Sequence, residues 1–216
     1  MSKNIKVIFF DFDGVLAESV NVKTEAFRKL YLPYGTSIAE RVVAYHLAHG
    51  GVSRFEKIAL FHRQWLNLPI TDEELLQIAA QFSKLCLEGV VNAPEVKGAQ
   101  AFLDSAEHYR KFIITGTPTD EIRQILQLRN MAAYFEAAYG SPEKKEYWAG
   151  KIIAEQRLNP AECVFIGDAM ADYHAAKLHD IPFVLRETEE NIPLFKDHTG
   201  YRIKDLDELN ILLNRI

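Results

Sequence analysis

The chain has 216 residues, with little cysteine and no long apolar segment, and each absence excludes a class of protein. Its two cysteines, Cys86 and Cys163, lie in apolar surroundings, which favours buried thiols over a disulfide and fits a reducing compartment. No apolar run approaches the roughly 18–20 residues that span a bilayer. The first apolar run is interrupted by Asp11 and Asp13, which does not fit a signal peptide. We therefore expect a soluble cytoplasmic protein.

The chain also lacks an excess of positive charge. Its formal net charge of -5 gives no general attraction to nucleic acid or to an anionic membrane, so we expect neither as a partner. Three catalytic patterns are absent as well: the metalloprotease spacing H-E-x-x-H, the P-loop G-x-x-x-x-G-K-[ST], and G-x-S-x-G of the α/β-hydrolases. An anionic substrate would need a local positive site.

Near the N-terminus, a short apolar run is followed directly by two acids. Residues 5–10 predict a buried strand, and Asp11 and Asp13 then flank Phe12. In an extended chain, both carboxylates point to the same side, where they repel each other unless a cation is bound. Gly14 permits a tight turn after them. Because ligands of α/β sheets bind at the carboxyl ends of strands, we predict a metal-dependent active site here.

The segment that follows has helical spacing and little that resembles a strand. We expect helices over residues 24–31, 38–48, 53–65 and 71–87. Ser53 and Thr71 each stand three residues before a glutamate, the spacing of a capping box. Residues 19–92 therefore predict a domain of about four helices.

Beyond residue 92, the spacing of apolar residues alternates between that of a strand and that of a helix. Strands are expected at 111–114, 135–139, 163–166 and 183–185, and helices over 94–108, 118–129, 145–156, 170–179 and 206–213. Strands separated by helices imply βαβ units and a mostly parallel sheet. The prediction is an α/β core, residues 1–18 and 93–216, which the helical domain interrupts after its first strand.

Polar residues follow three of these strands, in the segments 115–118, 140–145 and 167–172. Parallel strands share one carboxyl edge, so these loops should converge there. The set combines carboxylates, a hydroxyl, a lysine and glycine-containing turns. Clusters of carboxylate oxygens suit Mg2+, which binds a few carboxylates together with water and phosphate oxygens.

The segments D-F-D-G-V-L, I-I-T-G, G-S-P-E-K-K and G-D-A-M-A-D resemble the motifs of the haloacid dehalogenase-like hydrolase superfamily, in the family's order and over nearly the whole chain. The helical insert resembles the phosphatase branch with an α-helical cap, which includes phosphoglycolate phosphatases and β-phosphoglucomutases. The resemblance implies a Rossmann-like three-layer core with a five-stranded parallel sheet of order 5-4-1-2-3. It also implies a four-helix cap and chemistry through an aspartyl-phosphate.

The resemblance assigns roles to four aspartates. Asp11 matches the nucleophile, and Asp13 matches the general acid/base that protonates the leaving oxygen and then activates water. An acid at position 13 argues against dehalogenation, because a halide leaves without a proton. Asp168 matches a direct Mg2+ ligand, Asp172 a water-mediated ligand or orienting group, and the carbonyl of Asp13 a further ligand.

The remaining catalytic residues would bind the transferring phosphoryl group. Thr115 matches its hydroxyl donor, with the amide of Gly116 beside it. Lys145 or Lys144 would neutralise charge on the phosphoryl oxygens and on the nucleophile. We prefer Lys145, because G-S-P-x-x-K is the commoner spacing in the family. Taken alone, each of these residues is better explained as an ordinary turn residue or as a solvated side chain at a helix start, and the functional interpretation depends on the four motifs together.

Residues 49–57 of the expected cap contain Gly50 and Gly51, followed by Arg54. They form either a simple tight turn or a substrate-specificity loop in which Arg54 binds an anion or sugar hydroxyls. The loop resembles those of family members that accompany surface-polysaccharide sugar pathways, which would favour a sugar phosphate. No role is assigned to five histidines: His62, His108, His174, His179 and His198.

We predict a Mg2+-dependent phosphatase that acts on a small phosphorylated metabolite, with a sugar phosphate as one candidate. A phosphosugar mutase with the same pair of aspartates is the first alternative. A binding or regulatory protein on an inactive scaffold is the second, and the complete acidic set argues against it.

Overall fold

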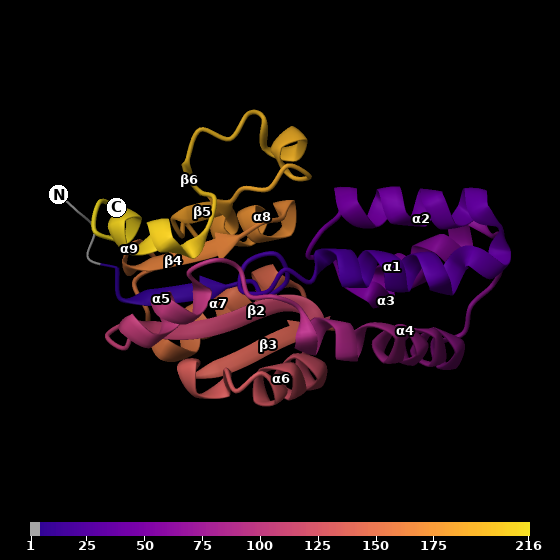
Figure 1. Ribbon diagram of the computed structural model, residues 1–216, viewed down its shortest axis with the longest axis horizontal. Coiled ribbons are helices and arrows are strands. Elements are labelled where there is room, and N and C mark those ends of the chain that lie inside the picture. Colours follow the sequence, from indigo (N-terminus) through magenta and orange to yellow (C-terminus); the bar gives the residue numbers. More distant parts are fainter. Residues whose placement is uncertain (1–4) are drawn as a thin grey trace.

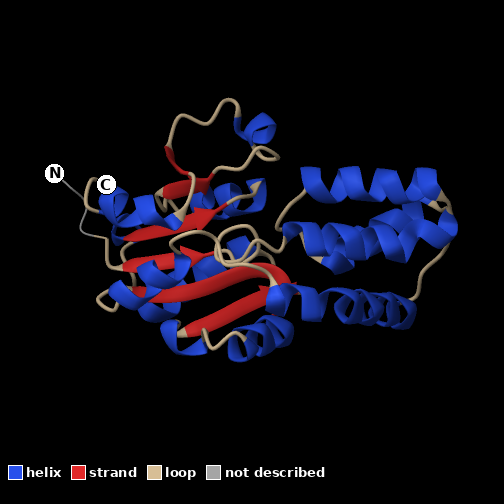
Figure 2. Cartoon of the chain, in the orientation of Figure 1, coloured by secondary structure: helices blue, strands red, loops and turns tan. Residues whose placement is uncertain are grey.

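The computed structural model describes residues 5–216, and a six-stranded parallel sheet forms its centre (Figures 1 and 2). The order is β3-β2-β1-β4-β5-β6, which confirms the Rossmann-like class and the order 5-4-1-2-3 of the first five strands. Residues 1–4 of the expected core segment lie outside the described residues. The strands are β1 (Val7–Phe10), β2 (Arg110–Pro118), β3 (Ala137–Ser141), β4 (Cys163–Gly167), β5 (Phe183–Arg186) and β6 (Tyr201–Ile203).

The predicted count of five strands is wrong, because β6 adds a strand at one edge. β6 pairs with β5 in parallel, with Tyr201 opposite Val184. It has only three residues, and Tyr201 is 42% exposed, so no apolar run marks it in the sequence. A short edge strand of this kind carries almost no periodic signal.

Helices cover both faces of the sheet. α5 (Ala99–Ser105), α6 (Thr119–Leu128) and α9 (Leu209–Leu213) pack on one face, and α7 (Lys145–Gln156) and α8 (Met170–Leu178) pack on the other. Side chains of β1 alternate between these two layers: Ile8 and Phe10 belong to the first cluster, Val7 and Phe9 to the second. Burial on both faces explains why β1 is a continuous apolar run.

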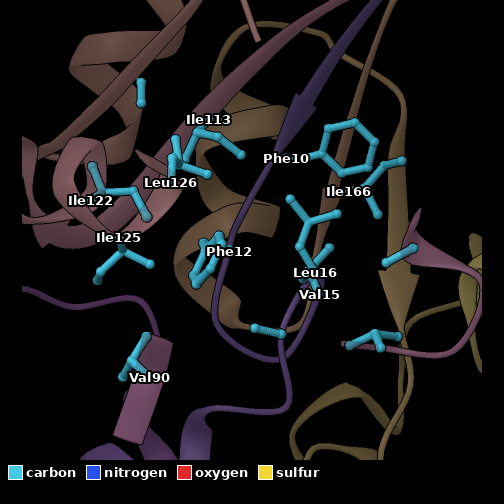
Figure 3. Packing of buried hydrophobic residues seen from close by; sticks show 14 of the residues in the cluster. Phe10, Phe12, Val15, Leu16, Val90, Ile113, Ile122, Ile125, Leu126 and Ile166 are labelled. Atoms are coloured by element: carbon cyan, nitrogen blue, oxygen red, sulfur yellow. The ribbon is translucent and has the colours of Figure 1, made fainter. Parts of the chain in front are cut away.

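The loop after β1 is anchored by its own apolar side chains. Phe12, Val15 and Leu16 are fully buried, and Figure 3 shows Phe12 on the side of Ile125, and Val15 and Leu16 on the side of Ile166. These contacts fix the backbone that carries the acids on either side of Phe12. The amide of Gly14, whose φ is +78°, donates to the Ala17 carbonyl at 2.8 Å and closes the turn.

The α-helices of residues 20–92 lie beside the sheet, as Figure 1 shows. They are α1 (Val20–Tyr31), α2 (Thr36–Ala48), α3 (Arg54–Leu60), which continues into a π-helical turn (Phe61–Trp65), and α4 (Asp72–Asn92). An aromatic cluster joins them: the ring of Phe27 lies 4.3 Å from that of Phe82 and 6.0 Å from that of Phe61. The division into a core (1–18 and 93–216) and a cap (19–92) stays our interpretation of this arrangement.

Two local predictions differ from the structure. The capping box of Thr71 and Glu74 is confirmed, but Ser53 accepts from the Phe55 amide without a reciprocal bond from Glu56, which lies near Lys144 instead.

The helix expected over 94–108 is reduced to α5. The segment before it is held by the loop after β1, because the Val96 amide donates to the Leu16 carbonyl at 3.1 Å. Within residues 5–216, no helix is long and apolar enough to cross a membrane.

Candidate active site

Three acids meet at the carboxyl edge of the sheet. Asp11 follows β1, Asp168 follows β4, and Asp172 lies in the first turn of α8. One carboxylate oxygen from each lies within 4.8 Å of the others. The side chains of Asp11 and Asp172 are buried, at 4% and 0% exposure. The topology argument thus placed these residues at the correct edge.

Lys145, at the start of α7, lies between two of these acids. Its Nζ is 2.8 Å from Oδ2 of Asp11 and 2.6 Å from Oδ1 of Asp172. Burial alone would lower the pKa of Lys145, but the two carboxylates outweigh it and raise the pKa. The Lys144 side chain is 69% exposed, and its Nζ lies 3.9 Å from Glu56. The structure therefore brings Lys145 to the acidic cluster, and Lys144 to the surface beside the cap.

One ammonium group does not balance the three carboxylates. Burial, followed by the charges of Asp11 and Asp172, raises the pKa of Asp168 well above its usual value. Burial likewise raises the pKa of Asp172 to about 7, although Lys145 opposes the shift. An all-oxygen donor set with excess negative charge fits a hard divalent cation such as Mg2+. Asp11, Asp168 and Asp172 are the residues that would hold it.

Asp13 has a separate set of partners. Its Oδ1 accepts from the Ser19 hydroxyl at 2.6 Å, and its Oδ2 accepts from the Thr117 hydroxyl at 3.2 Å and pairs with Lys23 of α1. Burial alone would raise the pKa of Asp13, but Lys23 and the two hydroxyls outweigh it and lower the pKa. The side chain is therefore held in its ionised form. Its proposed contribution to a metal through the main-chain carbonyl stays a prediction.

Lys23 and Thr117 were not identified from the sequence. The Lys23 Nζ donates to the Thr117 hydroxyl at 2.5 Å, so the two bind Asp13 as a connected group. Lys23 also joins a cap helix to the core. The sequence does contain an indication of its position. Lys23 stands four residues before the buried Phe27, so both side chains lie on the same face of α1.

Two of the predicted phosphoryl-binding residues, Thr115 and Gly116, line one cavity together with Asp11 and Asp13. Thr115 is 2% exposed, and its hydroxyl accepts from the Thr117 amide at 3.3 Å. A Cβ at Gly116 would lie 2.5 Å from the carbonyl oxygen of Gly51 in the cap, so only glycine fits without movement. Thr115 and Gly116 therefore lie where the cap loop meets the core.

The cap loop 49–57 approaches the acidic cluster closely. A Cβ at Gly51, whose φ is +72°, would lie 3.2 Å from the Lys145 Nζ, and one at Gly50 would lie 3.1 Å from the Ala169 Cβ. The glycines form the expected tight turn and also permit this approach. Its predicted role in substrate specificity requires such proximity and stays a prediction.

Arg54 lines the cavity, but its guanidinium group is already bound to other side chains of the protein. Its guanidinium forms a two-point ion pair with Glu121 of α6, at 2.6 and 2.8 Å, and donates to the Ser83 hydroxyl at 2.5 Å. Its side chain is 3% exposed. Arg54 therefore ties the cap to the core, and its predicted substrate contact stays a prediction.

A cavity of about 180 Å³ lies between the acidic cluster and the cap. Asp11, Asp13 and Thr115 line it from the core. His46 of α2 and Lys57 of α3 line it from the cap, and the sequence analysis assigned a role to neither, although Lys57 ends the predicted loop 49–57. The volume suits a small molecule.

The family model of the haloacid dehalogenase-like hydrolases matches residues 5–180. The chain belongs to this family. A phosphoglycolate phosphatase from Photorhabdus laumondii is similar to it, with 29% identity over 190 residues, or 84% of this chain and 80% of the relative. The family predicted from the motifs is thereby confirmed.

Solved structures of the family share the fold. A structure described as a predicted phosphoglycolate phosphatase from Haemophilus somnus aligns with a TM-score of 0.75 at 18% identity, covering 97% of this chain and 98% of that one. A β-phosphoglucomutase from Clostridium difficile aligns with a TM-score of 0.72 at 18% identity, covering 95% and 93%. At these identities the likeness concerns the fold alone.

Proposed function

We propose that this hydrolase is a Mg2+-dependent phosphatase that removes the phosphoryl group from a small phosphomonoester through an aspartyl-phosphate on Asp11. The observation that carries the proposal is the Lys145 ammonium between Asp11 and Asp172, with Asp168 in the same 4.8 Å cluster. The curated relative named as a phosphoglycolate phosphatase supports it. Phosphoglycolate and sugar phosphates are the candidate substrates.

In the first step, a carboxylate oxygen of Asp11 attacks phosphorus and the ester bond to the leaving oxygen breaks. Lys145, the Thr115 hydroxyl and the Gly116 amide hold the phosphoryl oxygens as charge develops on them. Asp13 gives a proton to the leaving oxygen, which departs as the alcohol. Asp11, Asp168 and the Asp13 carbonyl, with Asp172 directly or through water, would hold Mg2+, which when bound would supply charge neutralisation at the phosphoryl group.

In the second step, Asp13 takes a proton from water, whose oxygen attacks the aspartyl-phosphate and releases inorganic phosphate. This step needs Asp13 ionised, the form that Lys23 favours. The first step needs Asp13 protonated, so the arriving substrate has to weaken its ion pair with Lys23. The contact between Gly51 of the cap and Gly116 of the core would limit the access of other water molecules.

The proposal is tested by phosphate release from a broad panel of phosphomonoesters, with and without Mg2+. We expect turnover that requires Mg2+ and falls by on the order of 10³-fold or more in Asp11→Asn. Asp197→Asn, at an exposed position outside the cavity, is the matched control and should leave turnover unchanged.

Retained turnover in a folded Asp11→Asn protein would contradict the aspartyl-phosphate route. Isomerised phosphosugar in place of free phosphate would favour the mutase. Absence of any phosphate release, together with retained binding of a partner, would favour the inactive scaffold.

A further inference from the structure

The cap wall of the cavity contains a buried lysine without a carboxylate partner. Lys57 of α3 is 2% exposed and lines the same cavity as Asp11 and Asp13. Its Nζ lies 3.0 Å from Nδ1 of His46, and it forms no ion pair with any acid in the described part of the chain. Burying an ammonium group without a counter-ion is costly, so this position needs an explanation.

Other cations that line this cavity differ from Lys57 in this respect. Each of them already has a carboxylate within ion-pair distance: Lys23 pairs with Asp13, Arg54 with Glu121, and Arg186 with Glu18. Their charge is thus largely compensated inside the protein, and they have little left to offer a ligand. Lys57 has its donor atoms available for an anion that enters the cavity.

The groups around Lys57 favour an anion rather than a further cation. Burial, together with the charges of Lys23 and Lys145, lowers the pKa of Lys57 to about 7, while Glu56 on its own helix opposes the shift. Burial, followed by Lys57, also lowers the pKa of His46. A neutral His46 whose Nδ1 accepts from Lys57 carries its proton on Nε2, which makes it a second donor.

We propose that Lys57 and His46 form a subsite for a second anionic group of the substrate, a carboxylate or a further phosphate. This Lys57 subsite rests on the proposed function, in which Asp11 attacks the phosphoryl group at the other wall of the cavity. The Phe27 ring lies 5.9 Å from the Lys57 Nζ, so the ammonium group faces an apolar wall and few waters can compete for it. Lys57 and Asp11 line the same cavity, so a small substrate can contact both walls.

The test compares three esters of similar length: phosphoglycolate, ethanediol bisphosphate and ethyl phosphate. For the wild type we expect kcat/KM to be higher for an ester with a second anionic group than for ethyl phosphate. In Lys57→Met this ratio should fall by at least about tenfold, the effect of losing one charge-assisted hydrogen bond. The ester with the larger fall identifies the second group as carboxylate or phosphate.

Lys84→Met removes an exposed cation from α4 of the cap, outside the cavity, and should leave the ratio unchanged. An unchanged ratio in Lys57→Met, with phosphate still released, would overturn the subsite and leave the proposed function standing. A wild type that prefers ethyl phosphate or sugar monophosphates would also overturn the subsite without affecting the proposed function. A wild type that hydrolyses no phosphomonoester would overturn both.

A second measurement keeps Lys57 in place and so does not depend on how its variants fold. Calorimetric titration of the Asp11→Asn protein in Mg2+ would compare ethyl phosphate with whichever of phosphoglycolate and ethanediol bisphosphate the wild type prefers. The Kd should be at least about tenfold lower for the ester with the second anionic group. Equal dissociation constants would overturn the subsite.

Discussion

The two walls of the cavity differ in the charge that they leave uncompensated. The core wall includes Asp11 and Asp168, which together with Asp172 form a cluster of three carboxylates with one ammonium group, Lys145, so negative charge is in excess there. The cap wall has Lys57 beside His46, with positive charge and no acid of its own within ion-pair distance among residues 5–216. The first wall needs a cation and the second an anion. A divalent metal and a substrate with two anionic groups would complete both.

We expect the largest loss of stability from substitution of Lys145, the ammonium group within the acidic cluster. Lys145→Met leaves Asp11 and Asp172 buried without their ammonium partner, and loss of one member of a buried ion pair costs about 3–5 kcal/mol of unfolding free energy. We expect denaturant unfolding to show this loss in the absence of metal, and added Mg2+ to restore part of it. Phosphate release should fall as well.

Lys144→Met is the matched control, because its side chain is exposed and its ion pair with Glu56 is long. It should change the unfolding free energy by less than about 1 kcal/mol. Equal losses in the two variants, or a greater loss in Lys144→Met, would assign the site lysine to position 144.

The junction between the walls depends on Arg54 and Glu121. Arg54→Met should lower the unfolding free energy by about 3 kcal/mol, since it leaves the Glu121 carboxylate buried and unpaired. The double variant Arg54→Met/Glu121→Leu should recover much of this loss in a double-mutant cycle. If Arg54→Met instead keeps its stability and raises KM across the substrate panel, Arg54 binds substrate as the sequence predicted.

The acidic wall should respond to metal even without turnover. Mg2+ at about 100 times its Kd should raise the unfolding free energy by about 2.7 kcal/mol, because it binds only the folded protein. Asp168→Asn should lose most of this gain, and Asp197→Asn should retain it. A gain of equal size in Asp168→Asn would place the metal elsewhere.

Lys57 should make stability depend on pH in the opposite sense from a lysine in an ordinary ion pair. Lys57 has a folded pKa of about 7, below the unfolded value of 10.5, so the unfolded chain binds more protons between these values. The contribution of Lys57 to stability is therefore most favourable above pH 10.5 and declines as the pH falls to about 7.

Between pH 7.5 and 8.5, we expect Lys57 to contribute a rise of about 1 kcal/mol in the unfolding free energy of the metal-free protein. Lys57→Met should remove that rise and be the more stable protein at pH 7.5, which chemical unfolding at the two pH values can measure. Identical pH dependence in the wild type and Lys57→Met would show that the amine is compensated within the protein.

The core wall was predictable because its residues follow strands. Asp11, Asp168 and Lys145 stand at loops whose position is fixed once the apolar runs are assigned to parallel strands. The segment before Asp11 has the continuous burial of a central strand, which is visible in the sequence alone. The choice between Lys144 and Lys145 depended on family spacing, and the structure resolved which of the two reaches the acids.

The cap wall was not predictable in the same way. Lys57, His46 and Lys23 reach the cavity from three different helices, and their convergence depends on how those helices pack on the core. A lysine in an amphipathic helix has the same local signal whether it is solvated or buried. Strand β6 was missed for a related reason, since three residues, of which only Ile203 is buried, form a strand only because β5 lies beside them.

The central claim is that Asp11 attacks phosphorus before water does, and the stereochemical course at phosphorus tests it most directly. Each in-line displacement inverts the configuration, so a route through an aspartyl-phosphate inverts twice. We predict that hydrolysis of a thiophosphate monoester, made chiral with oxygen isotopes, proceeds with net retention of configuration. Net inversion would mean that water attacks the ester directly and would contradict the role of Asp11 as nucleophile.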